Sequence, residues 1–327
     1  MKCSIIIPNW NGRRFLKTCL GSLAAQSHKP FEIILVDNGS TDATIDFVKK
    51  RFPRVKIIAL AKNVGFAAAV NAGIKKASGD YVALLNNDTE ADKNWLKNML
   101  DAARRQPEAM FFASKMLDYY KRDTIDSCGD AMTWCGRSYK IGEGEKDGPR
   151  YQKEKFIFGA CAGAALYRKE FFAEVGYFDE DFFAYLEDVD IDFRAQFLGL
   201  KCLFASDARV YHIGSATAGR KSRFAFGLMI RNHFFVILKD YPLSLLIANL
   251  PKIIYSEFRF FLASIREGFV GKYFQSILGI ILQTRTMLKK RGFIQRHRTV
   301  SNQELNKNID NNFNYKPLFQ ALKNYRG

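Results

Sequence analysis

Two acidic residues stand just beyond short apolar segments, a placement that suits chemistry on a phosphate-bearing ligand. Asp37 follows the apolar residues 33–36, and Asp88 follows residues 81–85 and two asparagines. In an open α/β sheet, ligands bind in the crevice beyond the carboxyl ends of the strands. Carboxylate oxygens there can bind Mg²⁺ or Mn²⁺ while the ion bridges phosphates. The two residues therefore predict a nucleotide site with a divalent cation.

A second group of acidic residues suits proton transfer. Glu187, Asp188, Asp190 and Asp192 lie at the start of a predicted helix. The helix dipole favours acidic residues in the first turn, so most of them need no catalytic role. On an ideal helix Asp190 lies about 200° around from Asp188, so they cannot all face one way. One member of the Glu187-Asp188 pair, pointing into a cleft, could act as general base for a hydroxyl nucleophile.

His212 ends a predicted strand and precedes a basic loop of small residues, 214–221. If this loop folds over a diphosphate, Arg220, Lys221 or Arg223 would stabilise the leaving charge. A lone histidine is more often structural, and an ordinary surface loop explains the same residues. Structural interpretations also stay open for Asp37, as a turn residue, and for Asp88, as a helix cap.

These residues need a scaffold, and the first 90 residues predict one of alternating strands and helices. Apolar runs indicate the strands, and apolar residues at helical spacing indicate the helices. The expected strands are residues 4–8, 32–36, 55–60 and 81–85, and the expected helices are 13–26, 42–51 and 63–76. This order predicts an α/β fold with a mostly parallel sheet covered by helices on both faces.

The pattern changes after residue 90. Further helices are expected at 93–105 and 186–198, and further strands at 110–113, 203–204 and 210–212. Residues 118–155 suit surface loops or a hairpin. The small residues 159–165 would allow a ligand to approach the backbone or a neighbouring strand to pack tightly. Helices are expected over 224–268 and 273–288. The predicted organisation is a catalytic domain at 1–222, a basic helical region at 223–300 and a loosely ordered polar tail at 301–327.

The charge is concentrated in the C-terminal third. The net charge is +17, and residues 220–327 hold 19 Lys/Arg against 5 Asp/Glu. Apolar runs such as 234–238 and 277–282 lie among these charges. A basic, apolar-rich segment suits an anionic membrane surface better than it suits nucleic acid. A homodimer interface, or a helical subdomain packed on the core, is the alternative.

Location follows from what the sequence does not contain. No stretch reaches the roughly 18 consecutive apolar residues of a spanning helix. The first residues lack a signal-peptide core. Six cysteines without a Cys-x-x-Cys pair fit reduced thiols. We therefore expect a cytoplasmic protein, peripheral on the inner face of the plasma membrane.

Seven motifs in order resemble those of the inverting family 2 glycosyltransferases, which have the GT-A fold. The resemblance covers roughly residues 3–240. Its motifs are residues 4–12, 36–42, 63–66, 85–89, 176–180, 187–190 and His212. Each motif alone is weak, but their shared order makes the match specific. The resemblance implies a GT-A sheet followed by the C-terminal helical basic region.

The resemblance also implies roles for individual residues. Pro8, Asn9 and Asp37 would hold the base and ribose of a nucleotide-sugar donor. Further donor contacts are expected from Asn11, Asn63, Asn86, Asn87 and Arg220.

The same resemblance assigns the chemistry. Asp88 matches the last residue of the family's Asp-x-Asp metal motif, and His212 matches a later metal or diphosphate ligand. Asp188 matches the base that deprotonates the acceptor hydroxyl, with Glu187 beside it. These residues imply a single displacement at the sugar's anomeric carbon with inversion, assisted by Mg²⁺ or Mn²⁺.

One departure from the family pattern concerns the metal motif. Its first acidic residue is Asn86 here, which predicts weaker metal binding. This form, with the Arg231-Asn232 pair, is similar to the bacterial subset that includes rhamnosyltransferases of cell-surface polysaccharide assembly. Residues 194–197 stand where processive synthases carry Gln-x-x-Arg-Trp. We therefore expect transfer of one sugar, from dTDP-rhamnose or a UDP-sugar, to a cell-surface glycan or lipid-linked acceptor.

Two other functions fit part of the sequence. A sugar-1-phosphate nucleotidyltransferase would share the sheet type but needs a Gly-rich basic loop after the first strand, where residues 9–14 hold one glycine. A non-enzymatic basic protein that binds nucleic acid or membrane would explain the charge but not the acidic residues at the strand ends.

Overall fold

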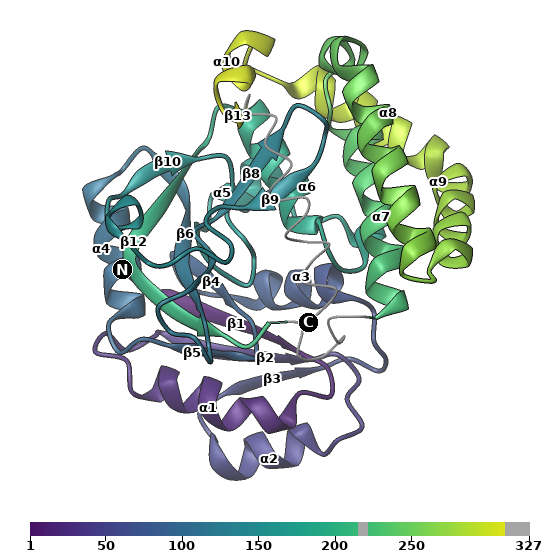
Figure 1. Ribbon diagram of the computed structural model, residues 1–327. Helices are drawn as coiled ribbons and strands as arrows, with labels where there is room; N and C mark the ends of the chain where they lie inside the picture. The colour runs from purple at the N-terminus through teal and green to yellow at the C-terminus, as the bar shows by residue number, and fades with distance from the viewer. Residues whose placement is uncertain (215–221, 311–327) are drawn as a thin grey trace.

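The computed structural model describes residues 1–214 and 222–310, and its centre is a ten-stranded mixed sheet (Figure 1). The sheet order is β10-β12-β6-β11-β4-β1-β2-β3, with β5 paired to β12 and β7 paired to β6. Its strands are β1 (Cys3–Asn9), β2 (Glu32–Asp37), β3 (Lys56–Ala59), β4 (Tyr81–Leu85), β5 (Thr89–Ala91), β6 (Ala109–Asp118), β7 (Ile125–Ser127), β10 (Lys155–Ile157), β11 (Ala164–Arg168) and β12 (Lys201–His212).

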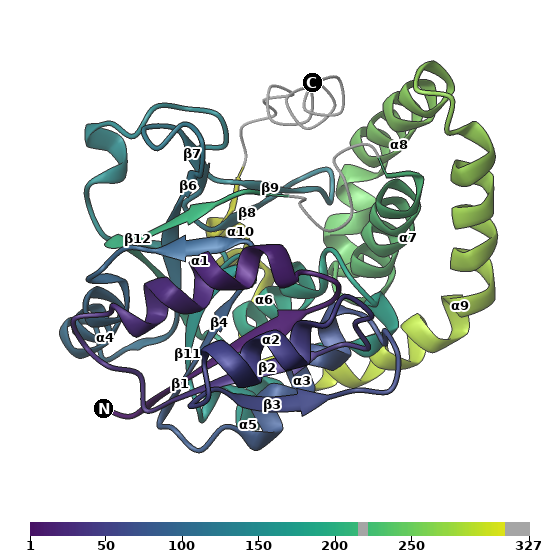
Figure 2. The same ribbon diagram turned by 90° about the horizontal axis from the view of Figure 1, so that it is seen from below.

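The centre of the parallel half of this sheet is buried on both faces, whereas its edge strand β3 is partly exposed. β4, β1, β2 and β3 pair in parallel, and every residue of β1 and β4 is buried. Such continuous apolar strands need cover on both sides. In Figures 1 and 2, α1 (Arg13–Ala24) and α2 (Thr44–Arg51) cover one face and α3 (Phe66–Lys76) covers the other. The predicted mostly parallel α/β sheet is therefore confirmed.

The rest of the sheet mixes directions. β6 pairs in parallel with β12 and antiparallel with β11, which joins it to β4. β12 was expected as two short strands, but it is one strand of 12 residues with an irregularity between Ala205 and Arg209. The bulge lets the polar residues Ser206, Asp207 and Arg209 interrupt the apolar pattern without ending the strand. The helices here are α4 (Trp95–Arg105), α5 (Phe171–Val175) and α6 (Glu187–Phe197).

Three long helices follow the sheet: α7 (Arg223–Lys239), α8 (Leu243–Arg266) and α9 (Val270–His297). The prediction of a single helix over residues 224–268 is wrong. The first helix ends at Lys239, and a second one begins at Leu243 with Pro242 as its N-cap. Proline has no backbone N–H to donate and is therefore tolerated at a helix start. None of the helices within residues 1–214 and 222–310 is long and apolar enough to cross a membrane.

The chain is ordered further than expected. α10 (Asn302–Lys307) begins with a capping box between Ser301 and Glu304. β13 (Ile309–Asp310) then pairs with β8 (Asp130–Thr133), which also pairs with β9 (Ser138–Lys140). The β8–β9 pair is the hairpin that residues 118–155 predicted. The prediction of a loosely ordered tail is wrong through Asp310, and its remainder lies outside the described residues.

The helical region shares its core with the catalytic half. One apolar cluster joins Phe193 of α6 to Phe235 of α7, Leu245 of α8 and Met287 of α9. Figures 1 and 2 both show α7–α9 beside the sheet, on the side toward which β2 and β3 run. The helices therefore stand next to the strand ends where the predicted site residues lie.

Candidate active site

The ends of β1 and β2 hold three predicted site residues together. Asn9 lies opposite Asp37 in the parallel register, and its side-chain amide donates to Asp37 Oδ1 at 3.3 Å. Asn87, beyond the end of β4, donates to Asn9 Oδ1 at 2.6 Å. A Cβ on Gly12 would lie only 2.1 Å from Asn87 Nδ2, so the turn after β1 requires glycine for this contact. Asn87 thus faces Asn9 and supports the ends of β1 and β2.

Two residues that were predicted to contact the nucleotide-sugar donor hold turns around this edge. Asn63 Oδ1 accepts from the Asn38 side chain at 3.0 Å and from the Gly65 N–H at 2.9 Å. Asn11 Oδ1 accepts from the backbone N–H of Thr41 at 2.8 Å. Both amide oxygens therefore fix loops that flank the β1 and β2 ends. Pro8, the residue before Asn9, is buried within β1.

Asp88 and His212 meet as predicted, although they are 124 positions apart. The link is the pairing of β12 with β5, which aligns His212 with Thr89. His212 Nε2 lies 3.3 Å from Asp88 Oδ1, and Nδ1 lies 2.8 Å from Asp126 Oδ2. Burial alone would lower the pKa of His212, but the two carboxylates outweigh burial and raise it to about 9. The imidazole is therefore oriented and charged by two acidic neighbours.

Asp126 belongs to a charge-balanced group. Burial opposes its ionised form, but Lys140, at 3.1 Å, and His212 hold the pKa of Asp126 well below its usual range. Burial likewise opposes the charge of Lys140, and Asp126 reverses this and raises the pKa of Lys140. We call Asp88, Asp126, Lys140 and His212 the balanced group. Opposite charges within it compensate one another.

Asp188 lies in a second group whose acidic charges are poorly compensated. Its Oδ2 accepts from the Ala162 N–H at 3.2 Å, and its Oδ1 accepts from the Val189 N–H at 2.9 Å. Oxygen or sulfur atoms of Asp130, Cys161 and Asp188 lie within 4.8 Å of one another. Burial is the main reason that the pKa of Asp188 is raised, despite these donors.

Asp130 and Glu187 complete this second group. We call Asp130, Glu187 and Asp188 the unbalanced group. Burial, and then the charge of Asp188, raises the pKa of both carboxyls well above the usual range. Glu187 Oε2 is buried and has no hydrogen-bond partner among the residues that the structure describes. Asp188 is only half-buried, whereas Glu187 is buried. Of the predicted catalytic pair, Asp188 is thus the more exposed member.

The run of small residues before β11 joins the two groups. Gly163 accepts from the Asn86 N–H at 2.9 Å, next to the balanced group, and Ala162 donates to Asp188. A Cβ on Gly159 would lie 1.7 Å from Asp192 Oδ2, so tight packing explains this glycine. Small side chains therefore let residues 86–88 and Asp188 approach each other.

A strained loop delivers Glu187 and Asp188. Three residues in the turns before α6 have positive φ angles, although none of them is glycine. They are Phe183, Tyr185 and Leu186. Such conformations cost free energy and persist where surrounding contacts hold them. The Asn232 amide of α7 donates to carbonyl oxygens in this loop, at 2.9, 2.8 and 2.6 Å, on residues 182, 184 and 185. Asn232 thus links the helical region to the position of the candidate base.

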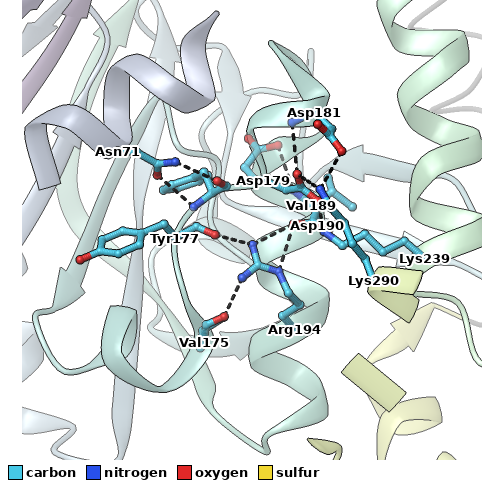
Figure 3. Close-up of polar contacts among 12 residues, drawn as sticks. Asn71, Val175, Tyr177, Asp179, Asp181, Val189, Asp190, Arg194, Lys239 and Lys290 are labelled. Carbon is cyan, nitrogen blue, oxygen red and sulfur yellow. Dashed lines mark hydrogen bonds and ion pairs between the residues drawn. The ribbon is translucent and has the colours of Figure 1, made fainter. Parts of the chain in front are cut away.

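Three other acidic residues of this region, Asp179, Asp181 and Asp190, form ion pairs (Figure 3). Lys239 of α7 forms ion pairs with Asp179 and Asp190, and Lys290 of α9 also pairs with Asp179. Arg194 holds Asp190 from one turn further along α6 at 2.8 Å. These contacts keep the pKa of Asp190 below its usual value despite burial. Asp190 therefore anchors α6 and is not available as a base.

The structure gathers most of the predicted residues at one edge of the sheet. Arg220 lies outside the described residues. Sequence reasoning missed Asp126, Asp130 and Lys140, because all three lie in the polar segment interpreted as surface loops. The Asp126-Ser127 step into a glycine turn offered only a weak signal.

Comparisons with known proteins place the chain in a family. The family model for Glycosyl transferase family 2 matches residues 4–176, more than half of the chain. The chain belongs to glycosyl transferase family 2. Its enzyme class is therefore that of the glycosyltransferases, and the expected resemblance is confirmed.

Relatives of this family 2 glycosyltransferase come from several bacteria. The N-acetylglucosaminyl-diphospho-decaprenol L-rhamnosyltransferase of Mycobacterium tuberculosis is 27% identical over 234 residues, covering 63% of this chain and 74% of the relative. The O-antigen biosynthesis protein RfbC of Myxococcus xanthus is 29% identical, covering 66% of this chain and 18% of the relative.

Solved structures share the fold of this family 2 glycosyltransferase. GalNAc-T7, determined with UDP, GalNAc and Mn²⁺, superposes with a TM-score of 0.57 at 18% identity, covering 72% of this chain and 48% of that chain. TarS of S. aureus superposes with a TM-score of 0.53 at 21% identity, covering 90% and 55%. The chain thus spans about half the length of these two structures. The likeness confirms the expected GT-A fold.

Proposed function

We propose that this family 2 glycosyltransferase transfers one sugar, with inversion, from a nucleotide-sugar donor to a hydroxyl of a cell-surface glycan or lipid-linked acceptor. The observation that carries the proposal is the placement of the half-buried Asp188 carboxylate beside the Asp88–His212 pair, across a run of small residues. The name of the Mycobacterium tuberculosis relative supports a rhamnose donor, expected as dTDP-rhamnose, before a UDP-sugar, and a polyprenyl-linked acceptor. The name of the Myxococcus xanthus relative supports an O-antigen glycan as acceptor.

The donor's nucleoside would lie at the ends of β1 and β2. Asp37 already accepts from Asn9 and from the Ser40 N–H, at 3.3 and 3.1 Å. A carboxylate has about four acceptor positions, so Asp37 can also accept from a base or ribose. Pro8 and the turns held by Asn11 and Asn63 would form the walls of this subsite.

The balanced group would hold the metal. One carboxylate and one imidazole nitrogen, 3.3 Å apart, are ligands that Mn²⁺ would accept on displacing the Nε2 proton, and Mg²⁺ would use mainly the carboxylate and phosphate oxygens. Asp126 fixes the ring so that Nε2 faces Asp88. When bound, such an ion supplies charge neutralisation of the leaving diphosphate. Asn86 and Asn87 contribute no carboxylate, so most of the remaining ligands would come from the donor and water.

The transfer step is a single displacement. The acceptor hydroxyl oxygen forms a bond to the anomeric carbon while the bond from that carbon to the diphosphate oxygen breaks. The hydroxyl proton passes to the Asp188 carboxylate, and the nucleoside diphosphate leaves. Burial and neighbouring charge favour the protonated form of Glu187, so Asp188 can carry the charge of the pair.

Thermal unfolding with dTDP, UDP, GDP and their sugars, with and without Mn²⁺, tests this proposal. A nucleotide at 100 times its dissociation constant stabilises a protein by about 2.7 kcal/mol, which here raises Tm by about 5 °C. We expect one nucleotide to do so only with Mn²⁺, and Asp88→Asn to abolish the shift. Asp207→Asn, at an exposed position of the irregular part of β12, is the matched control. No shift with any nucleotide, in solution and with vesicles present, would contradict the proposal.

A further inference from the structure

The outward side of α8 is apolar although it faces solvent. Side chains at spacings of three, four, four and seven residues form one exposed stripe, consisting of Ile247, Leu250, Ile254, Phe258 and Ile265. Two of them, Ile247 and Ile254, are 65% and 59% exposed. A surface helix of a soluble protein normally turns its polar side outward. The exposed apolar stripe therefore indicates a surface that contacts a partner.

The opposite side of α8 is already packed against the protein. Leu245, Ile253 and Phe260 are buried there. Phe260 belongs to an apolar cluster with α7 and α9. The exposed stripe is therefore a second apolar side, and the folding core does not need it.

α9 continues this exposed apolar surface. Phe274, Leu278, Ile281 and Leu282 lie on one side of its first half and are 56–74% exposed. α8 and α9 are joined by a short turn at 267–269, so the two stripes belong to one helical hairpin. In Figures 1 and 2 this hairpin forms an outer edge of the molecule. We call these exposed residues of α8 and α9 the hairpin surface.

Basic residues border the hairpin surface. On α8, Lys252, Arg259 and Arg266 repeat every seven residues, in a sector between the stripe and the buried side. On α9, Arg285 and Lys289 extend the exposed side toward its C-terminus. Residues 223–300 hold 13 Lys/Arg against 3 Asp/Glu. An apolar stripe with a basic border is typical of helices that lie in the interface of an anionic bilayer.

The basic border of the hairpin surface favours an anionic lipid surface over a second copy of the chain as its partner. A two-fold contact through the hairpin surface would place the same basic border on both sides of the interface. Like charges facing each other are unfavourable, whereas anionic headgroups complement them. We propose that the α8–α9 hairpin docks this glycosyltransferase on an anionic lipid surface, with its apolar stripe at the level of the acyl boundary. This inference goes beyond the transfer reaction, because it concerns a surface separate from the donor site.

Sedimentation of the full chain with vesicles tests the inference. The lipids are pure phosphatidylcholine or phosphatidylcholine with about 30% phosphatidylglycerol, at low and at high salt. We expect binding to the anionic vesicles, weakened by salt. The double variant Ile281→Glu/Leu282→Glu should bind about tenfold more weakly or worse, because two charges replace apolar contacts. Phe31→Glu/Phe156→Glu, at exposed positions of the sheet domain, is the matched control and should bind as the parent does.

Two further measurements keep the outcomes distinct. Circular dichroism and Tm establish that each variant folds, and the metal-dependent nucleotide shift establishes that the donor site is intact in it. The inference is overturned if the parent does not bind anionic vesicles. It is also overturned if Ile281→Glu/Leu282→Glu binds them as tightly as the parent, or if light scattering shows a dimer that this variant dissociates without any vesicle binding by the parent. Loss of vesicle binding with an unchanged nucleotide shift would leave the proposed transfer reaction untouched.

Discussion

The balanced and unbalanced groups lie side by side in the same site, yet they shift acidic pKa values in opposite directions. In the balanced group, Lys140 and His212 keep Asp126 ionised although it is buried. In the unbalanced group, burial raises the pKa of Glu187 and Asp188, and the nearest donors are backbone N–H groups. Burial is common to both, so the difference comes from the compensating cations.

This difference suits the two groups to separate tasks. A compensated carboxylate stays charged at neutral pH and can orient or ligate. A carboxylate whose pKa is raised gains affinity for a proton, which a general base requires. The same carboxylate side chain can therefore serve either task, depending on whether the fold places a cationic side chain beside it.

The largest expected effect comes from removing the proton acceptor. Asp188→Asn keeps the size of the side chain and should lower kcat about a thousandfold, because a positioned base typically contributes a factor of about 100 to 10,000. Steady-state transfer rates measure this effect. Asp190→Asn is the comparison variant on the same helix. If Asp188→Asn retained more than about a tenth of the parent kcat, Asp188 would not be the base.

Next in size is the loss of an ion pair that anchors α6. Lys239→Met leaves Asp179 and Asp190 buried without their shared cation. Breaking such a buried pair costs about 3 to 5 kcal/mol, so we expect the free energy of unfolding to fall by that amount. Urea denaturation measures it. Lys146→Met, in an ion pair whose partners are both about 70% exposed, should change stability by less than about 1 kcal/mol. Equal losses in both variants would contradict the anchoring role.

A smaller effect is expected from the residue that orients His212. Asp126→Asn removes the carboxylate 2.8 Å from Nδ1 and should weaken Mn²⁺ binding about 10- to 100-fold. It should also lower the pKa of His212, since Asp126 is the largest contribution that raises it. NMR titration of the imidazole in the metal-free protein measures this second effect, which general damage to the fold would not produce selectively. An unchanged His212 pKa would exclude the contact.

The smallest effect concerns pH. A general base works when it is deprotonated, so activity should fall as pH falls through the pKa of Asp188, which is raised from 3.8. Lys140 opposes this rise. Lys140→Gln should therefore move the acidic limb of the kcat profile to higher pH, and Lys146→Gln should leave it in place. A shift to lower pH in Lys140→Gln would contradict the electrostatic argument.

The sheet could be predicted well from the sequence because the apolar pattern of a strand is a local signal. Apolar runs such as residues 81–85 are fully buried strands, and the polar residues after them mark the strand ends. It predicted Asp88 and His212 from motif order, and the β5–β12 pairing brings them together. The strand 201–212 was divided wrongly, because a bulge carries polar residues through the sheet without ending it.

The missed residues depend on long-range contacts. Asp126 and Lys140 gain their meaning only when β7 and β9 fold against His212, which no local pattern in residues 118–155 indicates. Asn232 is similar, because its role depends on a left-handed loop that begins 50 residues earlier. Mechanistic residues at the ends of strands can thus be read from sequence, whereas those that compensate or hold them require the fold.

Calorimetric titration with Mn²⁺ and the nucleotide selected by thermal unfolding tests the division of tasks most directly. It is performed on two variants, Asp88→Asn and Asp188→Asn. We predict that Asp188→Asn binds the Mn²⁺–nucleotide pair within about threefold of the parent affinity, while catalysing almost no transfer. Asp88→Asn should lose the Mn²⁺-dependent part of the affinity. The opposite pattern, with metal-dependent binding lost in Asp188→Asn and kept in Asp88→Asn, would contradict the assignment of metal and base to the two groups.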